Sequence, residues 1–269
     1  MASFFGEVSE LSSRAVDDEE VDNQPKFAIQ LETLDTSKAC SNIPCKAGIF
    51  AVGDSPSAFV KSYLLPENAT AIAKVKCLRT QNDDSSEFYN GIKNSLSSDA
   101  RSIAAIYLID ADHLFFDISS NTPEELSTIL CNMLHNHFCC DLGIILTSVH
   151  ASAFKSEKAI SKLQPRFLKT LTTSSFASNY ACNIPKLQVP NFLSKFPAAL
   201  LTKFEIRKKP ALCIISYVDT NVVDFMNSEF YKALFDIPVF SNLQVNANGN
   251  SRLFELCREA HCKAPNLYT

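Results

Sequence analysis

The feature that most limits the possible folds is a buried strand followed directly by a helix start. Residues 48–53 (Gly-Ile-Phe-Ala-Val-Gly) are an uninterrupted apolar run that ends in glycine, which is typical of a strand buried within a sheet. Ser55 and Pro56 come next; serine is a good helix cap, and proline suits the first helical position. Apolar residues then recur at helical spacing up to Leu65. This stretch therefore predicts a strand–turn–helix unit.

Strand and helix patterns alternate along the rest of the chain. Strands are predicted over residues 27–31, 71–77, 142–147 and 211–217, with a hairpin formed by 102–109 and 114–116. Helices are predicted over residues 165–171, 196–206, 228–235 and 251–261, whereas prolines 185 and 190 favour a loop over 172–195. The alternation predicts an α/β protein, a three-layer sandwich in which a central mixed sheet is covered by helices on both faces.

One further helix, from about Pro123 to His137, has the clearest start signals. Thr122 is a suitable cap, proline follows it, and Glu125 completes a capping box. The apolar positions of this helix recur on one face, which we expect to face the core; they are Leu126, Ile129, Leu130 and Leu134.

Both ends of the chain differ from this central part. Residues 1–26 contain an acidic run at 17–22 and are predicted to be a largely disordered lead-in, in which Phe4 and Phe5 dock on a surface. Residues 27–262 are predicted to form a single domain. Residues 263–269 are predicted to be a flexible tail, because Pro265 stops the preceding helix.

Composition excludes several classes of protein. The formal net charge is −4 without a long basic run, which argues against nucleic acid and anionic membranes as partners. No apolar run approaches the roughly 18 residues of a membrane helix. The chain has ten cysteines, but residues 1–11 lack the apolar region of a signal peptide, so we expect reduced thiols and a cytoplasmic protein. The sequon at Asn68 is then interpreted as chance.

Two groups of residues could support an enzyme. Asp110, Asp112 and His113 lie in the predicted hairpin, and Ser148 and His150 follow a predicted strand. However, the chain has only six glycines and contains no phosphate-binding glycine motif and no G-x-S-x-G nucleophile elbow. Structural roles are therefore favoured. An α/β hydrolase or a nucleoside-cleaving enzyme remains the alternative, and it requires that Ser148, His150 and Asp110 meet in one cavity.

Two clusters contain metal-ligand residue types but lack a paired C-x-x-C framework. The first is His135, His137, Cys139 and Cys140, and the second is Cys257, His261 and Cys262. We interpret these cysteines as small buried hydrophobes and expect no metal and no cofactor.

The last three residues offer three chemical handles on one short peptide. Leu267 provides apolar area, Tyr268 provides an aromatic ring with a polar tip, and Thr269 carries the terminal carboxylate. A basic group or backbone amides can capture that carboxylate, so the tail suits a narrow pocket on a partner.

Several stretches, in order along the chain, resemble the eukaryotic proteasome assembly chaperones. The matching residues are 1–2, 4–8, 51–53, 58–59, 145–147, 150, 155, 167–171, 190–191, 197–201, 210–212, 217–219 and 266–269. Residues 70–100 match this family poorly.

The resemblance implies a non-enzymatic protein with an α/β sandwich fold. It implies a heterodimer with a related chaperone that binds the outer face of proteasome α subunits, promotes correct α-ring assembly, prevents off-pathway α-ring dimers and blocks premature docking of activators. It also implies that Leu267, Tyr268 and Thr269 form a hydrophobic–tyrosine–any-residue motif, which enters pockets between α subunits, where a lysine meets the carboxylate. A proteasome activator would share only this tail, and an ATPase cap would need the phosphate loop that the sequence lacks.

Overall fold

The computed structural model describes residues 26–34, 43–80, 101–156, 166–220, 223–240 and 243–263. Contacts divide the chain into two units, one made of residues 1–28 with 78–100 and the other of residues 29–77 with 101–269. The described part of the first unit consists of residues 26–28 and 78–80, which belong to two strands. The fold below is that of the second unit.

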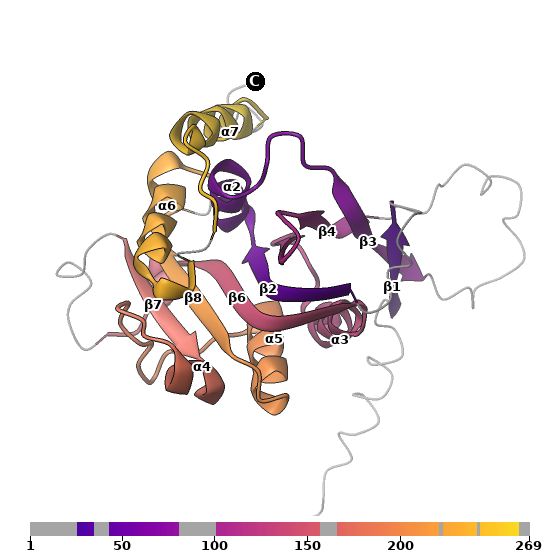
Figure 1. Ribbon diagram of the computed structural model, residues 1–269, viewed down its shortest axis with the longest axis horizontal. Helices are drawn as coiled ribbons and strands as arrows, with labels where there is room; N and C mark the ends of the chain where they lie inside the picture. Colours follow the sequence, from indigo (N-terminus) through magenta and orange to yellow (C-terminus); the bar gives the residue numbers. More distant parts are fainter. Residues whose placement is uncertain are drawn as a thin grey trace, which may run out of the picture. The chain divides into compact units, whose positions relative to one another are not determined.

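An eight-stranded sheet with the order β1-β3-β4-β5-β2-β6-β8-β7 forms the middle layer (Figure 1). β5, β2, β6 and β8 run parallel, while β3–β4, β4–β5 and β7–β8 are antiparallel pairs, so the sheet is mixed. The strands are β1 (Lys26–Thr33), β2 (Ile43–Val52), β3 (Ala71–Thr80), β4 (Arg101–Leu108), β5 (His113–Ile118), β6 (Phe138–His150), β7 (Phe167–Thr172) and β8 (Ala211–Val218).

One face of the sheet is covered by α2 (Asp54–Tyr63), α6 (Phe225–Glu229), the 3-10 helices η6 (Phe230–Asp236) and η7 (Pro238–Phe240), and α7 (Gly249–Lys263) (Figure 1). Phe59 of α2 packs against the rings of Tyr63, Tyr231 and Phe235. The buried hydroxyl of Tyr231 donates a hydrogen bond to the backbone oxygen of Thr147, 2.7 Å away, and so fastens η6 to β6.

The other face is covered by α3 (Ser127–His137), which follows the short helix η3 (Glu124–Leu126), and by α5 (Lys195–Ile206) (Figure 1). Phe50 stacks on Phe116 of β5 with 4.2 Å between ring centroids, and Phe204 of α5 meets Phe50 edge-on. A Cβ atom on Gly143 would lie 2.7 Å from the Phe204 ring. The missing side chain in β6 therefore lets α5 approach the sheet closely.

This arrangement confirms the predicted three-layer α/β sandwich. The continuous apolar runs do mark buried strands: all eight residues of β8 are buried, as are residues 47–51 of β2. The predicted hairpin is the antiparallel pair β4–β5.

Two predictions between residues 165 and 195 were wrong. Residues 167–172 form the edge strand β7 rather than a helix. All six residues of β7 pair with β8, and this pairing overrides a weak local preference for helix. Within the predicted loop, residues 174–179 form the short helix α4 (Ser174–Asn179). Its N-cap is Thr173, whose side-chain oxygen accepts a hydrogen bond from the backbone N–H of Phe176 at 3.3 Å.

Two side-chain predictions also need correction. Ile129 lies on α3 but is 49% exposed, because the buried face of that helix is formed by Leu130, Cys131 and Leu134. Ser55 is not the cap of α2. Gly53 occupies the N-cap position with a φ of 96°, a conformation that favours glycine, and Ser55 is buried within the first helical turn.

Candidate functional site

The carboxyl ends of β2, β6 and β8 open onto a cavity of about 740 Å³, which we name the strand-end cavity. Its walls are the strand ends, the start of α2, residues 119–122, and the segment 190–197 that leads into α5. Ligands of open α/β sheets bind outside the carboxyl ends of parallel strands, and the volume lies within the range of ligand pockets. By position and size, this cavity is a candidate binding site.

Ser148 and His150, two of the predicted enzyme residues, line this cavity. Nδ1 of His150 accepts a hydrogen bond from the backbone N–H of Ser152 at 3.2 Å and lies 2.7 Å from the hydroxyl oxygen of Ser152. His150 is thus bound to the turn that follows β6. No hydrogen bond joins it to Ser148 among the described residues, so a serine–histidine pair is not assembled there.

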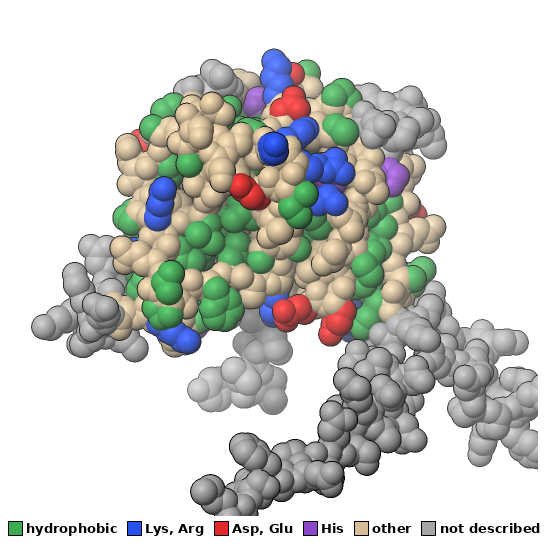
Figure 2. Space-filling model, turned by 90° about the horizontal axis from the view of Figure 1, so that it is seen from below, with side chains coloured by type: hydrophobic (Ala, Val, Ile, Leu, Met, Phe, Trp, Pro, Cys, Tyr) green, Lys and Arg blue, Asp and Glu red, His purple; other side chains and the backbone are tan. Residues whose placement is uncertain are grey.

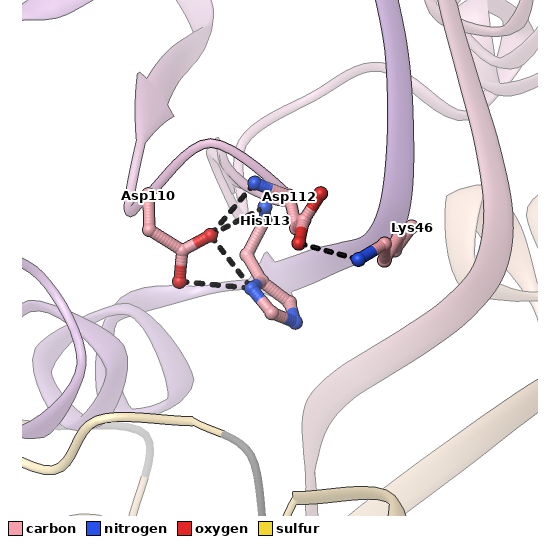
Figure 3. Close-up of polar contacts among 4 residues, drawn as sticks. All are labelled: Lys46, Asp110, Asp112 and His113. Carbon is pink, nitrogen blue, oxygen red and sulfur yellow. Dashed lines mark hydrogen bonds and ion pairs between the residues drawn. The ribbon is translucent and has the colours of Figure 1, made fainter.

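Asp110, Asp112 and His113 instead form the turn between β4 and β5 (Figure 3). The Asp110 carboxylate accepts the backbone N–H groups of Asp112 and His113 at 2.8 and 3.0 Å and contacts Nδ1 of His113 at 2.8 Å. Lys46 reaches over from β2 and pairs with Asp112 at 2.7 Å. Burial acts to raise the pKa of Asp110, but these N–H groups and the imidazole lower it overall. The cluster stabilises a turn.

The pair Ser148 and His150 and the turn that contains Asp110 lie at opposite ends of the parallel strands. His113 is aligned with Ala47 of β2, and Ala47 is aligned with Leu142 of β6. His150 lies further along β6, at a distance of about 26 Å for eight extended residues. Asp110 does not line the strand-end cavity, where the acidic residue is Asp54. The structure therefore does not bring Ser148, His150 and Asp110 together.

The predicted metal-ligand residues are also dispersed. No group of three or more potential ligands occurs within the residues that the structure describes. Cys140 and Cys257 are buried, as interpreted, whereas Cys139 is half-buried and Cys262 is exposed. The Sγ atoms of Cys140 and Cys45 lie 2.9 Å apart on neighbouring strands. The side chain of His261 is outside the described residues.

His135 is buried on α3 and meets Phe204 edge-on, with ring centroids 6.0 Å apart. Burial lowers its pKa to about 4, and the nearby charges of Arg207, Lys209 and Lys203 act in the same direction. The residues that follow α5 are basic, and Figure 2, in which the molecule is seen from below, shows lysine and arginine side chains gathered in the upper centre of this face. A neutral imidazole in this position serves packing.

The predicted tail residues, Leu267, Tyr268 and Thr269, lie outside the described residues, as does most of the lead-in with Phe4 and Phe5. The helix before the tail is firmly attached to the domain. A Cβ atom on Gly249 would lie 2.3 Å from a ring atom of Tyr63, so the start of α7 touches α2 directly. Arg252 donates a hydrogen bond to the backbone oxygen of Leu65 at 2.8 Å.

Sequence reasoning missed the rim of the strand-end cavity. Val189 is 92% exposed, and Phe192 is 76% exposed. Pro190 and Asn191 lie between them, and the peptide bond from Val189 to Pro190 is cis. The side chain of Asn191 accepts the backbone N–H of Lys155 at 2.7 Å and donates to its backbone oxygen at 2.9 Å. The sequence does show Phe192 in a segment between two prolines, but it does not show that this phenylalanine is exposed, because exposure depends on tertiary structure.

Helices long and apolar enough to cross a membrane are absent from the described ranges. Fold and site together define a three-layer α/β protein with a cavity at the strand ends, which Ser148 and His150 line and from which Asp110 is distant. Similar folds occur in two archaeal structures from Pyrococcus furiosus. One is PbaB, described as an archaeal proteasome activator, with a TM-score of 0.53, 10% identity and coverage of 87% of this chain and 96% of that one. The other is PbaA, described as an archaeal homolog of proteasome-assembly chaperone, with a TM-score of 0.51, 12% identity and coverage of 89% and 88%.

The family is shown by sequence. The family model described as "Proteasome assembly chaperone 4" matches residues 132–269, which is more than half of the chain. The chain belongs to the proteasome assembly chaperone family.

Its curated relatives include two proteins named Proteasome assembly chaperone 1. The protein from Xenopus tropicalis is 25% identical, with 92% of each chain covered, and the protein from Homo sapiens is 22% identical, with 100% of this chain and 99% of the human one covered. The resemblance noted in the sequence is thereby confirmed.

Proposed function

We propose that this chain is a chaperone subunit that acts with a related partner chaperone. The pair binds proteasome α subunits, promotes correct assembly of the α-ring and the core particle, and prevents off-pathway α-ring dimers. The chain itself catalyses no reaction and acts in the cytoplasm, with the nucleus and the surface of the endoplasmic reticulum as further locations.

The observation that carries this proposal is the extent of the family match. It runs through residue 269 and so includes Leu267, Tyr268 and Thr269. In the proposed role these residues enter a pocket between neighbouring α subunits, with the leucine and tyrosine side chains providing apolar contact and the terminal carboxylate meeting a positive charge.

Three residues bury little area and lose freedom on binding, so alone they bind weakly. A folded body that also touches the ring converts insertion of the tail into an intramolecular step with a high effective concentration. The attachment of α7 to α2 supports this division of labour, because it fixes to the domain the helix that precedes the tail in sequence.

Co-purification tests the proposal. The parent chain and a variant lacking residues 267–269 are each co-expressed with the partner chaperone and with α subunits. We expect the deletion variant to retain the partner chaperone and to recover much less α subunit. Equal recovery of α subunits by both chains would contradict the role of the tail, and recovery of none by either chain would contradict the proposed function as a whole.

A further inference from the structure

The strand-end cavity is locally positive within an acidic protein. The formal net charge of the chain is −4, yet the charged residues of this cavity are Lys155, Lys195 and Asp54, together with the titratable His150. Within the described ranges, neither Lys155 nor Lys195 has an ion-pair partner, since the ion pairs there involve other residues. Two lysines without ion-pair partners in the described ranges, against one aspartate, favour an anionic group in the cavity.

The backbone also contributes positive charge to the cavity. α2 begins at Asp54 and α5 begins at Lys195, and both helix starts line the cavity. Neither N-cap residue, Gly53 or Ser194, makes a side-chain cap hydrogen bond. The first N–H groups of a helix carry a partial positive charge, which adds to that of the lysines.

The apolar residues at the rim favour a ligand larger than a simple anion. Phe192 lines the cavity and is 76% exposed. Val189, three residues earlier in the sequence, is 92% exposed. The two hydrogen bonds between Asn191 and the backbone of Lys155 hold this segment in place, so Phe192 directly follows a residue that is fixed to Lys155. A phosphate ion would leave the apolar rim uncovered, and a single glycine, Gly53, lines the cavity where phosphate loops need several.

We propose that the strand-end cavity binds an extended segment of a protein partner in which acidic and hydrophobic side chains lie next to each other. A carboxylate of the segment enters between Lys155 and Lys195, and the neighbouring apolar side chain packs on Phe192. This contact differs in chemistry from that of the C-terminal tail, since the tail offers its own carboxylate to a partner whereas the cavity receives one.

Two blocked pentapeptides, ELDFE and its uncharged counterpart QLNFQ, test the proposal by titration into the isotopically labelled full-length chain, followed by NMR. We expect saturable shifts of the cavity's amide signals with ELDFE and an affinity for QLNFQ lower by about tenfold, or 1.4 kcal/mol. The double variant Lys155→Glu/Lys195→Glu should lose binding, whereas Lys186→Glu, an exposed lysine outside the cavity, should retain it. Phe192→Ala should weaken binding more than Phe254→Ala, which truncates an exposed phenylalanine on α7.

Several results would overturn the proposal: no saturable binding of ELDFE at millimolar concentration, equal binding of both peptides, or unchanged binding by the double variant. Inorganic phosphate provides a further arm. If it shifts the same signals at lower concentration than ELDFE and Phe192→Ala has no effect, the cavity is a phosphate site instead. Because the assay contains no α subunit and every variant keeps residues 267–269, its failure would leave the role of the tail untouched.

Discussion

The hydroxyl of Tyr63, the last residue of α2, donates a hydrogen bond to Oδ1 of Asn250 at the start of α7, 2.5 Å away. The same oxygen accepts a hydrogen bond from Lys232 at 2.9 Å, and Lys232 also lies over the Tyr63 ring. α7 is the last described element before the tail. This contact therefore anchors the start of α7 to α2.

Tyr63→Phe should destabilise the fold by about 1 kcal/mol, because it removes one partly buried hydrogen bond. Gly249→Ala should cost more, about 1–3 kcal/mol, because the new Cβ atom would overlap the Tyr63 ring. Urea unfolding measures both changes. Tyr180→Phe is the control, since Tyr180 is exposed, and a loss of stability equal to that of Tyr63→Phe would contradict the assignment.

Gly143→Ala should destabilise the other face of the sheet by about 1–3 kcal/mol, because its Cβ atom would lie 2.7 Å from the Phe204 ring. The same substitution combined with Phe204→Leu should recover part of this loss, since the smaller side chain leaves room for the methyl group. A double-mutant cycle of unfolding free energies gives the coupling. Strict additivity would mean that the two residues do not clash.

His135 should make the fold sensitive to acid. Its pKa falls from 6.5 to about 4 in the folded protein, so between these values the unfolded chain binds more protons. Stability should therefore be fully present above about pH 6.5 and decline by about 2–3 kcal/mol as the pH falls towards 4. In urea unfolding at pH 7 and pH 4.5, His135→Leu should flatten this dependence. His150→Gln, at an exposed histidine, should leave it unchanged.

Removing Thr269 alone should weaken binding to α-rings on the order of tenfold. The deletion moves the carboxylate back by roughly 3.3 to 3.6 Å along an extended chain and out of register with the pocket for Tyr268. Adding one residue after Thr269 should have a similar effect. Affinities for purified α-rings, with binding of the partner chaperone as the control, measure both. Parent-like affinity in either variant would rule out recognition of the carboxylate.

The layered fold could be predicted because its inner strands are almost entirely apolar. Residues 48–52 and 211–217 have no polar alternation that would place one face in water, and both are central strands. β7 was missed for the opposite reason. As an edge strand it buries only alternate residues, Leu168 and Thr170, and this short pattern can equally suggest a helix.

The site could be predicted only in part. Ser148 and His150 were recognised because they end a buried strand, where parallel sheets form their sites. Asp110 was grouped with them because the sequence does not show at which strand ends a hairpin turn lies. That depends on strand direction: β5 runs parallel to β2 and β6, so the turn before it lies at their amino ends. The exposed rim at Val189 and Phe192 depends on the link between Asn191 and Lys155, two residues far apart in sequence.

The close approach of α5 to the sheet at Gly143 has a mechanical consequence. The helix begins at the wall of the strand-end cavity and, after twelve residues or about 18 Å, gives way to Arg207, Lys208 and Lys209. Because α5 is one continuous helix, a shift of the helix away from the sheet at Gly143 would move both the cavity wall and the cationic end. A substitution of Gly143 would thus disturb both the strand-end cavity and the cationic end of α5 while changing no residue at either.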